Sequence, residues 1–219
     1  MKTLIALLLL TCVATASALP PPTPIGADGE SARGWAAYSQ GQHASALAHY
    51  RKAAERNHAV AQFNLAVMLV EGTGARARPA EGMAWLRRSA ENGFVKAQLA
   101  LADLHERGEH VRKSQTEATA WYRRAAVQGS RDARMGLATQ YFLGRGAPQS
   151  DAEAARWYEL AAAQGDAGGC YIIASMYEKG YGVPQDLERA FYWYLQAAAR
   201  GEAGAGAMAR SVQQRLNAG

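Results

Sequence analysis

The segment HERGEH, His105 to His110, holds two histidines and two glutamates, and these are side chains that zinc sites use. Zinc proteases carry their two histidines at i and i+4, where one helix brings both rings to the same face. Here the spacing is five, which sets the two rings about 140° apart around a helix. Gly108, which lies between them, is also a poor helix former. The segment therefore predicts no metal site, and no other histidine spacing in the chain predicts one.

A second candidate for chemistry is Cys170, because it is the only cysteine after the N-terminal stretch from Met1 to Ala18. A nucleophilic thiol needs a neighbouring base and an electropositive pocket, and the sequence around Cys170 indicates neither. We therefore interpret Cys170 as a small buried apolar side chain. The chain also lacks a G-x-S-x-G elbow, an S-x-x-K pair and a phosphate-binding glycine loop. These patterns predict a protein that is not an enzyme and that holds no cofactor.

The stretch from Met1 to Ala18 has the pattern of a secretory signal peptide. A basic second residue precedes an apolar stretch from Leu4 to Val13, and Ala16–Ala18 forms an A-x-A cleavage site. We expect cleavage after Ala18 and a periplasmic or secreted product. The alternative is a lipoprotein with lipid on Cys12, although Thr11 is larger than the residue that usually precedes such a site. No later stretch approaches the roughly 20 apolar residues that a transmembrane helix needs.

The 219 residues carry a formal net charge of +5, a mild bias that favours anionic neighbours such as membrane surfaces or acidic polymers. The basic residues do not cluster into a run along the sequence, so we expect no nucleic-acid binding. Residues 19–30 are rich in proline, and we expect them to be flexible.

The elements that must position any functional group are revealed by an internal repeat. The chain contains the four similar segments AWLRRSAENG, AWYRRAAVQG, RWYELAAAQG and YWYLQAAARG, and their tryptophans recur every 36 residues without insertion or deletion. The same period places leucine or isoleucine at Leu65, Leu101, Leu137 and Ile173. A repeat of this length predicts one pair of helices per unit, stacked on its neighbours because a single pair cannot bury its own apolar faces.

Each repeat divides into two helices, which we name helix A and helix B. In the first repeat an apolar pattern of period 3.6 predicts helix A over Ala59 to Glu71, ended by Gly72. Ser114 and Ser150 each stand three residues before a glutamate, which predicts a capping box at the start of helix B. In the first repeat Pro79 is suited to the first helical position.

These patterns predict an all-α, right-handed solenoid of antiparallel helix pairs. We expect full repeats at 59–94, 95–130, 131–166 and 167–202, preceded by a related pair at 31–58 with a shorter loop, closer to a tetratricopeptide unit. A capping helix is expected within 203–219. When the repeats are aligned, His105 stands where the others have Leu69, Tyr141 and Tyr177, so it occupies a packing position. His110 stands where the others have a loop glycine.

The sequence resembles the Sel1-like repeat family in these features, which include A-x-x-x-L-G/A-x-x-Y on helix A, a G-x-G-V-x-x-D loop and A-x-x-W-Y-x-x-A-A-x-x-G on helix B. The last repeat, GYGVPQDLERAFYWYLQAAARG, matches almost throughout. The resemblance implies a non-enzymatic protein-interaction scaffold, often in the bacterial cell envelope. A cysteine-rich branch of the family is linked to β-lactam hydrolysis, but the cysteine pairs of that branch are absent here. A binding module for cell-wall polysaccharide or peptidoglycan is the further alternative, and exposed aromatic residues would favour it.

A binding surface is predicted from geometry, with Leu65 and its equivalents taken to face helix B. The opposite, concave face of helix A then carries the side chains at offsets −2, +2 and +5 from these positions. They are Phe63, Val67, Val70, Leu99, Asp103, Glu106, Met135, Thr139, Phe142, Tyr171, Ser175 and Glu178. We expect this face to bind an unidentified protein or peptide partner, with the chain a monomer or weak homodimer. The alternative is that the side chains at offset −2 pack against adjacent helices.

Overall fold

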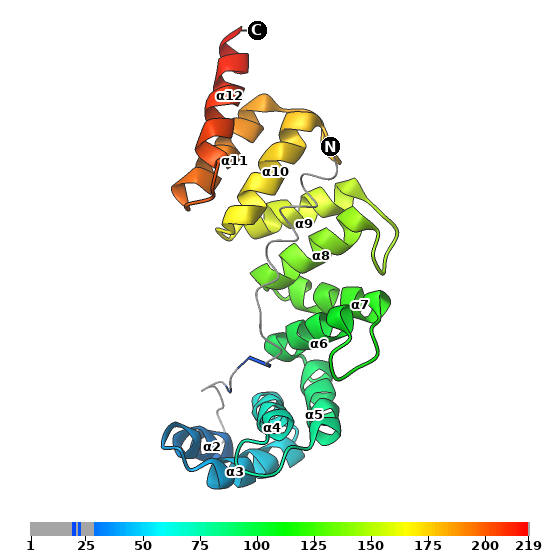
Figure 1. Cartoon of the computed structure of the whole chain (residues 1–219), viewed down its shortest axis with the longest axis vertical. Helices are drawn as coiled ribbons and strands as arrows, with labels where there is room; N and C mark the ends of the chain where they lie inside the picture. Colours follow the sequence, from blue (N-terminus) through cyan, green and yellow to red (C-terminus); the bar gives the residue numbers. More distant parts are fainter. Residues whose placement is uncertain (1–18, 21, 23–28, 219) are drawn as a thin grey trace. The chain divides into compact units, whose positions relative to one another are not determined.

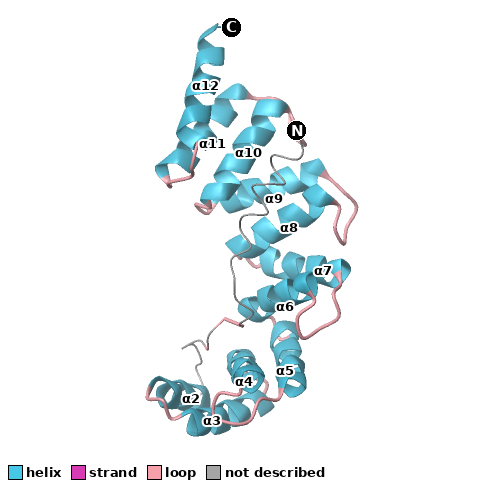
Figure 2. Cartoon of the chain, in the orientation of Figure 1, coloured by secondary structure: helices cyan, strands magenta, loops and turns pink. Residues whose placement is uncertain are grey.

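The computed structural model describes residues 19, 20, 22 and 29–218. The predicted signal peptide with Cys12, and most of the proline-rich segment, lie outside the described residues. The described part of the chain consists of helices and loops without a strand (Figure 2). Its helices are α2 (Gly29–Ser39), α3 (His43–Glu55), α4 (Ala59–Glu71), α5 (Pro79–Glu91), α6 (Val95–Arg107), α7 (Gln115–Val127), α8 (Arg131–Leu143), α9 (Asp151–Ala163), α10 (Ala167–Lys179), α11 (Leu187–Ala199) and α12 (Ala205–Ala218). The prediction of an all-α repeat fold is confirmed.

The helices pair in chain order (Figure 1). Helix A of each repeat is α2, α4, α6, α8 or α10, and helix B is α3, α5, α7, α9 or α11. Successive repeats also touch, since α3 packs on α4, α5 on α6 and α9 on α10, while α12 packs on α11. The chain divides into two compact units, an N-terminal unit that ends at Arg124 and a C-terminal unit that begins at Ala125.

Helix A follows the sequence pattern closely. The helix predicted over Ala59 to Glu71 is found with those bounds, and Gly72 ends it in the left-handed conformation with φ 75°. The equivalent glycines of the next three repeats end their helices in the same way. A glycine adopts this conformation without the steric cost that a Cβ imposes, so the spacing of these glycines fixes where each helix A stops.

The start of helix B differs in one respect from the predicted capping box. The hydroxyl of Ser150 accepts a hydrogen bond from the backbone N–H of Glu153 at 3.2 Å, as predicted. The reciprocal bond is replaced, because the backbone N–H of Ser150 donates to the carbonyl of Tyr141 in helix A at 3.0 Å. The Glu153 carboxylate instead accepts from Nε1 of Trp157 at 3.2 Å. The loop is therefore closed onto helix A by its own main chain.

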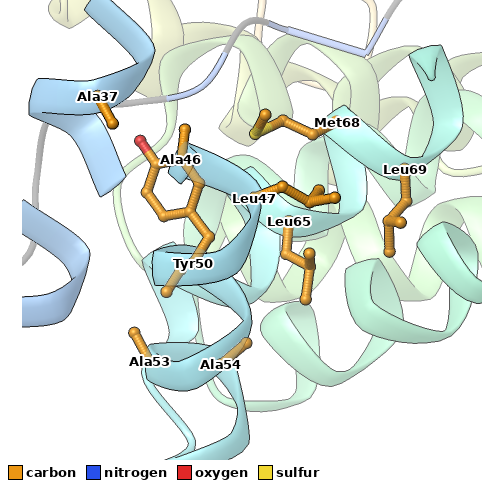
Figure 3. Packing of buried hydrophobic residues seen from close by; sticks show 10 residues of the cluster. Ala37, Ala46, Leu47, Tyr50, Ala53, Ala54, Leu65, Met68 and Leu69 are labelled. Carbon is orange, nitrogen blue, oxygen red and sulfur yellow. The ribbon is translucent and has the colours of Figure 1, made fainter. Parts of the chain in front are cut away.

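The core of the N-terminal unit combines alanines with larger aliphatic side chains and the ring of Tyr50. Tyr50 of α3 is fully buried, and Figure 3 shows it with Ala37, Ala46 and other side chains from α2, α3 and α4. Trp85 of α5 packs against the same cluster. Alanines let neighbouring backbones approach while the aromatic rings fill the space between them. Helix B therefore combines aromatic and alanine side chains in its packing.

A hydrogen bond from side chain to backbone joins each repeat to the helix B before it. The side chain at one position of helix A donates to an alanine carbonyl eight residues earlier. The pairs are Gln62 to Ala54 at 3.1 Å, Gln98 to Ala90 at 3.0 Å, Arg134 to Ala126 at 3.2 Å and Cys170 to Ala162 at 3.6 Å. The bond recurs in every interface although the residue type changes. The Cys170 thiol thus makes the same contact between repeats that an amide or a guanidinium makes elsewhere.

Ion pairs join the helices B of adjacent repeats on their exposed side. In the N-terminal unit, Arg51 of α3 lies 2.8 Å from Glu81 of α5. In the C-terminal unit, Glu159 of α9 lies 3.1 Å from Arg189 of α11. Each residue of the second pair stands three repeats, or 108 positions, after its counterpart in the first. The two interfaces therefore use the same positions with opposite polarity.

The loop of the second full repeat carries a non-glycine residue in the left-handed region. His110 has φ 55°, while the equivalent Gly74, Gly146 and Gly182 have φ between 68° and 81°. The backbone conformation of the equivalent glycines is therefore kept at His110 despite the side chain. Such a conformation costs a non-glycine residue about 1–2 kcal/mol.

We expect His110→Gly to raise the free energy of unfolding by about 0.5–1 kcal/mol, since the relief of strain exceeds the extra entropy of glycine in the unfolded chain. Urea unfolding followed by circular dichroism measures the change. His110→Ala is the control, because it keeps a Cβ at positive φ and should bring no gain. A less stable His110→Gly protein would instead mean that the imidazole makes stabilising contacts.

Candidate functional site

The structure places the twelve residues of the predicted helix A face in different environments. Phe63, Val67, Phe142 and Ser175 are buried, with at most 4% of their surface exposed. The other eight are half-buried: Val70, Leu99, Asp103, Glu106, Met135, Thr139, Tyr171 and Glu178. The four buried side chains have almost no surface to offer a partner. A partner-binding role for the remaining eight stays a prediction.

The side chains at offset −2 pack as the alternative interpretation anticipated. The Phe63 ring meets Phe94, the residue that precedes α6, edge to face at 5.3 Å between centroids. In the C-terminal unit, Tyr171 meets Tyr194 of α11 in the same manner at 5.3 Å. Met135 of α8 lies against Gly169 of α10, where its sulfur would be 3.1 Å from an added Cβ. These three side chains therefore contribute to packing within and between repeats.

In the second, third and fourth full repeats, a side chain at offset +2 or +5 meets a tyrosine of helix B in the same repeat. The Tyr122 hydroxyl lies 2.6 Å from Oδ1 of Asp103 and 2.8 Å from Oε2 of Glu106. One repeat later, Tyr158 and Thr139 pair their hydroxyls at 3.0 Å. The sequence assignment of a face pointing away from helix B was therefore wrong for these positions.

The last repeat adds a third helix to this arrangement. The Tyr194 hydroxyl donates to Oε2 of Glu178 at 2.9 Å, and Arg215 of α12 donates to Oε1 at 2.7 Å. One carboxylate thus ties α10 to both α11 and α12. The predicted capping helix within 203–219 is held partly by this contact.

The tyrosine hydroxyls of these contacts are held in the protonated form. Burial, followed by the charges of Asp103 and Glu106, raises the pKa of Tyr122 far above its ordinary value. Burial also raises the pKa of Tyr158, and burial with the charge of Glu178 raises that of Tyr194. These hydroxyls consequently stay protonated, and so can donate hydrogen bonds, to a higher pH than an ordinary tyrosine.

The segment HERGEH, His105 to His110, has a structural rather than a metal-binding explanation. His105 is only 6% exposed, and its Nδ1 lies 3.3 Å from the Arg112 carbonyl in the following loop. It therefore occupies the predicted packing position. Within the described residues, no group of three or more histidine, cysteine or acidic side chains is arranged to hold a metal ion.

Cys170 and the tryptophans are also engaged in packing. The Cys170 thiol is buried, and burial raises its pKa, so the nucleophilic thiolate is disfavoured. Trp121 and Trp157 are buried, and Trp85 and Trp193 are half-buried. The buried indole rings of Trp121 and Trp157 therefore cannot serve as stacking platforms for sugars.

Comparison with known proteins agrees with this architecture. The model of the Sel1 repeat family matches residues 31–58, 59–94, 95–130, 131–166 and 167–202. The match includes 31–58, the pair interpreted from the sequence as closer to a tetratricopeptide unit. No curated protein is similar enough in sequence to count as a relative.

Two solved structures are similar in both sequence and fold. The protective antigen c5321 of uropathogenic Escherichia coli, which displays an SLR fold, is 33% identical with a TM-score of 0.77 over 87% of this chain. This chain spans 42% of the length of that antigen. A Sel1 repeat protein from Oxalobacter formigenes is 32% identical with a TM-score of 0.69, and the match covers 79% of this chain and 74% of that one.

Sel1 repeats commonly mediate protein–protein interaction, and their fold is typically non-catalytic. In the part of the chain that the structure describes, no helix combines the length and apolar character needed to cross a membrane. The family match covers five consecutive repeats, and the described helices follow the same repeat. The chain therefore belongs to the Sel1 repeat family.

Proposed function

We propose that the protein is a non-enzymatic scaffold of the bacterial cell envelope that binds a segment of a partner protein at the half-buried part of helix A in the N-terminal unit. The observation that carries this proposal is the cluster of Asp103, Glu106 and Tyr122. Two carboxylates lie within 2.8 Å of one hydroxyl oxygen. Both groups are hydrogen-bond acceptors that carry charge when ionised, so negative charge is concentrated here.

The fold itself does not require both charges, since the fourth full repeat keeps only Glu178, the equivalent of Glu106. The first full repeat has Val67 and Val70 at the positions of Asp103 and Glu106, and the third has Thr139 and Phe142. Because both carboxylates are half-buried rather than buried, a partner could reach them. A lysine or arginine on a protein segment would gain charge-assisted hydrogen bonds there, and this is the partner chemistry that we propose.

Export to the envelope is supported by the leader pattern, a basic second residue, the apolar stretch Leu4 to Val13 and the Ala16–Ala18 cleavage motif. A non-enzymatic role is supported by the surroundings of the histidine and the cysteine that could have taken part in catalysis. His105 packs against its own loop, and the Cys170 thiol is buried with a raised pKa.

The test is crosslinking in cells with the tagged protein, followed by mass spectrometry of captured proteins. Asp103→Asn with Glu106→Gln removes both charges but keeps a carbonyl oxygen that can accept from Tyr122. We expect the amount of captured partner to fall by about tenfold, which corresponds to a loss of about 1.4 kcal/mol in binding free energy. The matched control is Glu117→Gln with Asp132→Asn, which removes the same charge at exposed positions and should leave capture unchanged.

Equal capture by all three proteins would place the partner elsewhere on the molecule and reject the site. Recovery of cell-wall polymer with no specific protein would reject the scaffold function in favour of polysaccharide binding. A circular dichroism melt of each variant checks that the fold is intact.

A further inference from the structure

Pairs of adjacent basic residues recur at one position of helix B throughout the N-terminal unit. They are Arg51–Lys52 on α3, Arg87–Arg88 on α5 and Arg123–Arg124 on α7, with 36 residues between equivalent positions. Arg51 is half-buried and the other five are exposed. Along the sequence these pairs are separated, and the repeat brings them to the same side of successive helices. We call these six residues the basic stripe.

Contacts within the unit hold parts of the stripe in place. The Arg88 guanidinium lies 4.8 Å from the centroid of the Trp85 ring, and that of Arg124 lies 4.5 Å from the Trp121 ring. A cation–π contact uses the face of the guanidinium, whereas its five N–H donors lie in its plane. The stacked arginines are thereby partly ordered before any ligand arrives, which lowers the entropy that binding costs.

The stripe residues of α3 and α5 lie on adjoining helices. The ion pair between Arg51 of α3 and Glu81 of α5 shows that the exposed sides of these two helices adjoin. The indole of Trp85, which carries Arg88, packs against the core cluster to which α3 contributes. The basic groups of α3 and α5 therefore belong to one surface, and the 36-residue repeat places those of α7 at the equivalent position of the next helix B.

The stripe is not needed for the repeat fold. At the same position the C-terminal unit has Glu159–Leu160 on α9 and Leu195–Gln196 on α11, and both helices form with the same length as α5. Because the position accepts acidic, apolar and amide residues there, packing does not explain its basic character in the N-terminal unit.

We propose that the basic stripe binds an acidic polypeptide segment of a partner protein. Five of the six residues are arginine, whose planar fork matches the geometry of a carboxylate. Exposed Glu55 and Glu91 each follow a stripe arginine by four residues and interrupt the positive field. Such interruptions suit a ligand that carries charges at separate points, as a peptide does, better than a uniformly charged polymer.

A lipid surface is disfavoured by the distribution of apolar groups. Among the described residues, the exposed large hydrophobic side chains are Val127, Tyr192 and Leu195. Val127 follows Arg124 by three residues on α7, whereas Tyr192 and Leu195 lie on α11, outside the stripe. One exposed apolar side chain falls short of the apolar face with which peripheral proteins anchor in a bilayer. This surface lies on helix B, so the proposal is separate from the one made for helix A.

The experiment measures binding of a fluorescein-labelled oligoglutamate peptide by fluorescence anisotropy. Arg87→Gln with Arg123→Gln removes two stripe charges and leaves both arginine–tryptophan stacks intact. Its Kd should rise about tenfold relative to the unmodified protein. Arg76→Gln with Arg112→Gln removes the same charge from exposed loop positions of the same unit and should change Kd by less than about twofold.

Equal weakening in both variants would mean that net charge alone attracts the peptide, and the proposal would fail. It would also fail if polygalacturonate bound more tightly than oligoglutamate, which would indicate a polysaccharide surface. Stripe-dependent binding to phosphatidylglycerol vesicles without peptide binding would indicate a membrane surface instead, and absence of all binding would reject the stripe as a docking site.

Discussion

Tyr158→Ala is expected to lower the free energy of unfolding by about 3–5 kcal/mol, as large-to-small changes at buried aromatic residues do. The side chain is fully buried, and its hydroxyl pairs with Thr139 at 3.0 Å. Removal of the ring would leave a cavity between α8 and α9 and would strand the Thr139 hydroxyl on one side. Urea unfolding followed by circular dichroism measures the loss.

Tyr158→Phe is the matched variant, because it keeps the ring and removes only the hydroxyl. It should cost about 1 kcal/mol, since Thr139 also donates to the Met135 carbonyl at 2.9 Å and keeps that bond. If phenylalanine proved as damaging as alanine, the hydroxyl pair rather than ring packing would dominate. Hydrogen exchange should localise the effect of Tyr158→Ala to α8 and α9 and their neighbours, because each repeat contacts mainly adjacent repeats.

Gly182→Ala is expected to destabilise the C-terminal unit by about 2–4 kcal/mol, the sum of two independent costs. Gly182 has φ +70°, where a Cβ is disfavoured. The added Cβ would also overlap the main-chain carbonyl of Asp151, the first residue of α9. Main chain at the start of a helix cannot move aside without breaking the packing between loop and helix.

Gly201→Ala separates the two costs. Gly201 has φ +83°, but a Cβ there would have nothing within 4 Å, so only the conformational term of about 1 kcal/mol applies. Thermal melts of the two variants measure the difference. Similar losses for both would show that the loop moves aside to admit the methyl group, contrary to the close approach seen at Asp151.

The sequence was sufficient to predict the helices and the repeat, because these depend on local signals. Glycine at the end of helix A and serine before helix B act through nearby backbone groups, and helix α4 has the predicted bounds. The partner-binding face could not be predicted as reliably. A period of 3.6 tells which residues share a side of a helix, but not which neighbour covers that side.

Asp103 illustrates this limit. Its position was assigned to an outward face because Leu101 was taken as the residue that points to helix B. The Tyr122 side chain is long enough to reach around the helix, and its hydroxyl meets Asp103 at 2.6 Å. The sequence did contain a signal, because Tyr122 occupies the position that Leu86 has in the first full repeat. A buried tyrosine hydroxyl needs a polar partner, and Asp103 could have been considered as that partner.

The series of side-chain to backbone hydrogen bonds that runs from Gln62 to Cys170 could not be predicted from the sequence for another reason. Its members share a repeat position but not a residue type, so similarity between repeats does not reveal them. What they share is a donor group directed at a main-chain carbonyl, and every residue supplies such an acceptor regardless of sequence. The regularity therefore lies in the backbone partner.

The two ion pairs between helices B have opposite charge order, since Arg51 pairs with Glu81 and Glu159 pairs with Arg189. This difference limits how freely the repeats could be rearranged in the gene. Repeats of equal length invite deletion or duplication by recombination. A rearrangement that set the helix of Arg51 beside that of Arg189 would bring two guanidinium groups together, and like charges at such a contact are destabilising. Although the repeats look interchangeable in sequence, these charges favour one order of assembly over its permutations.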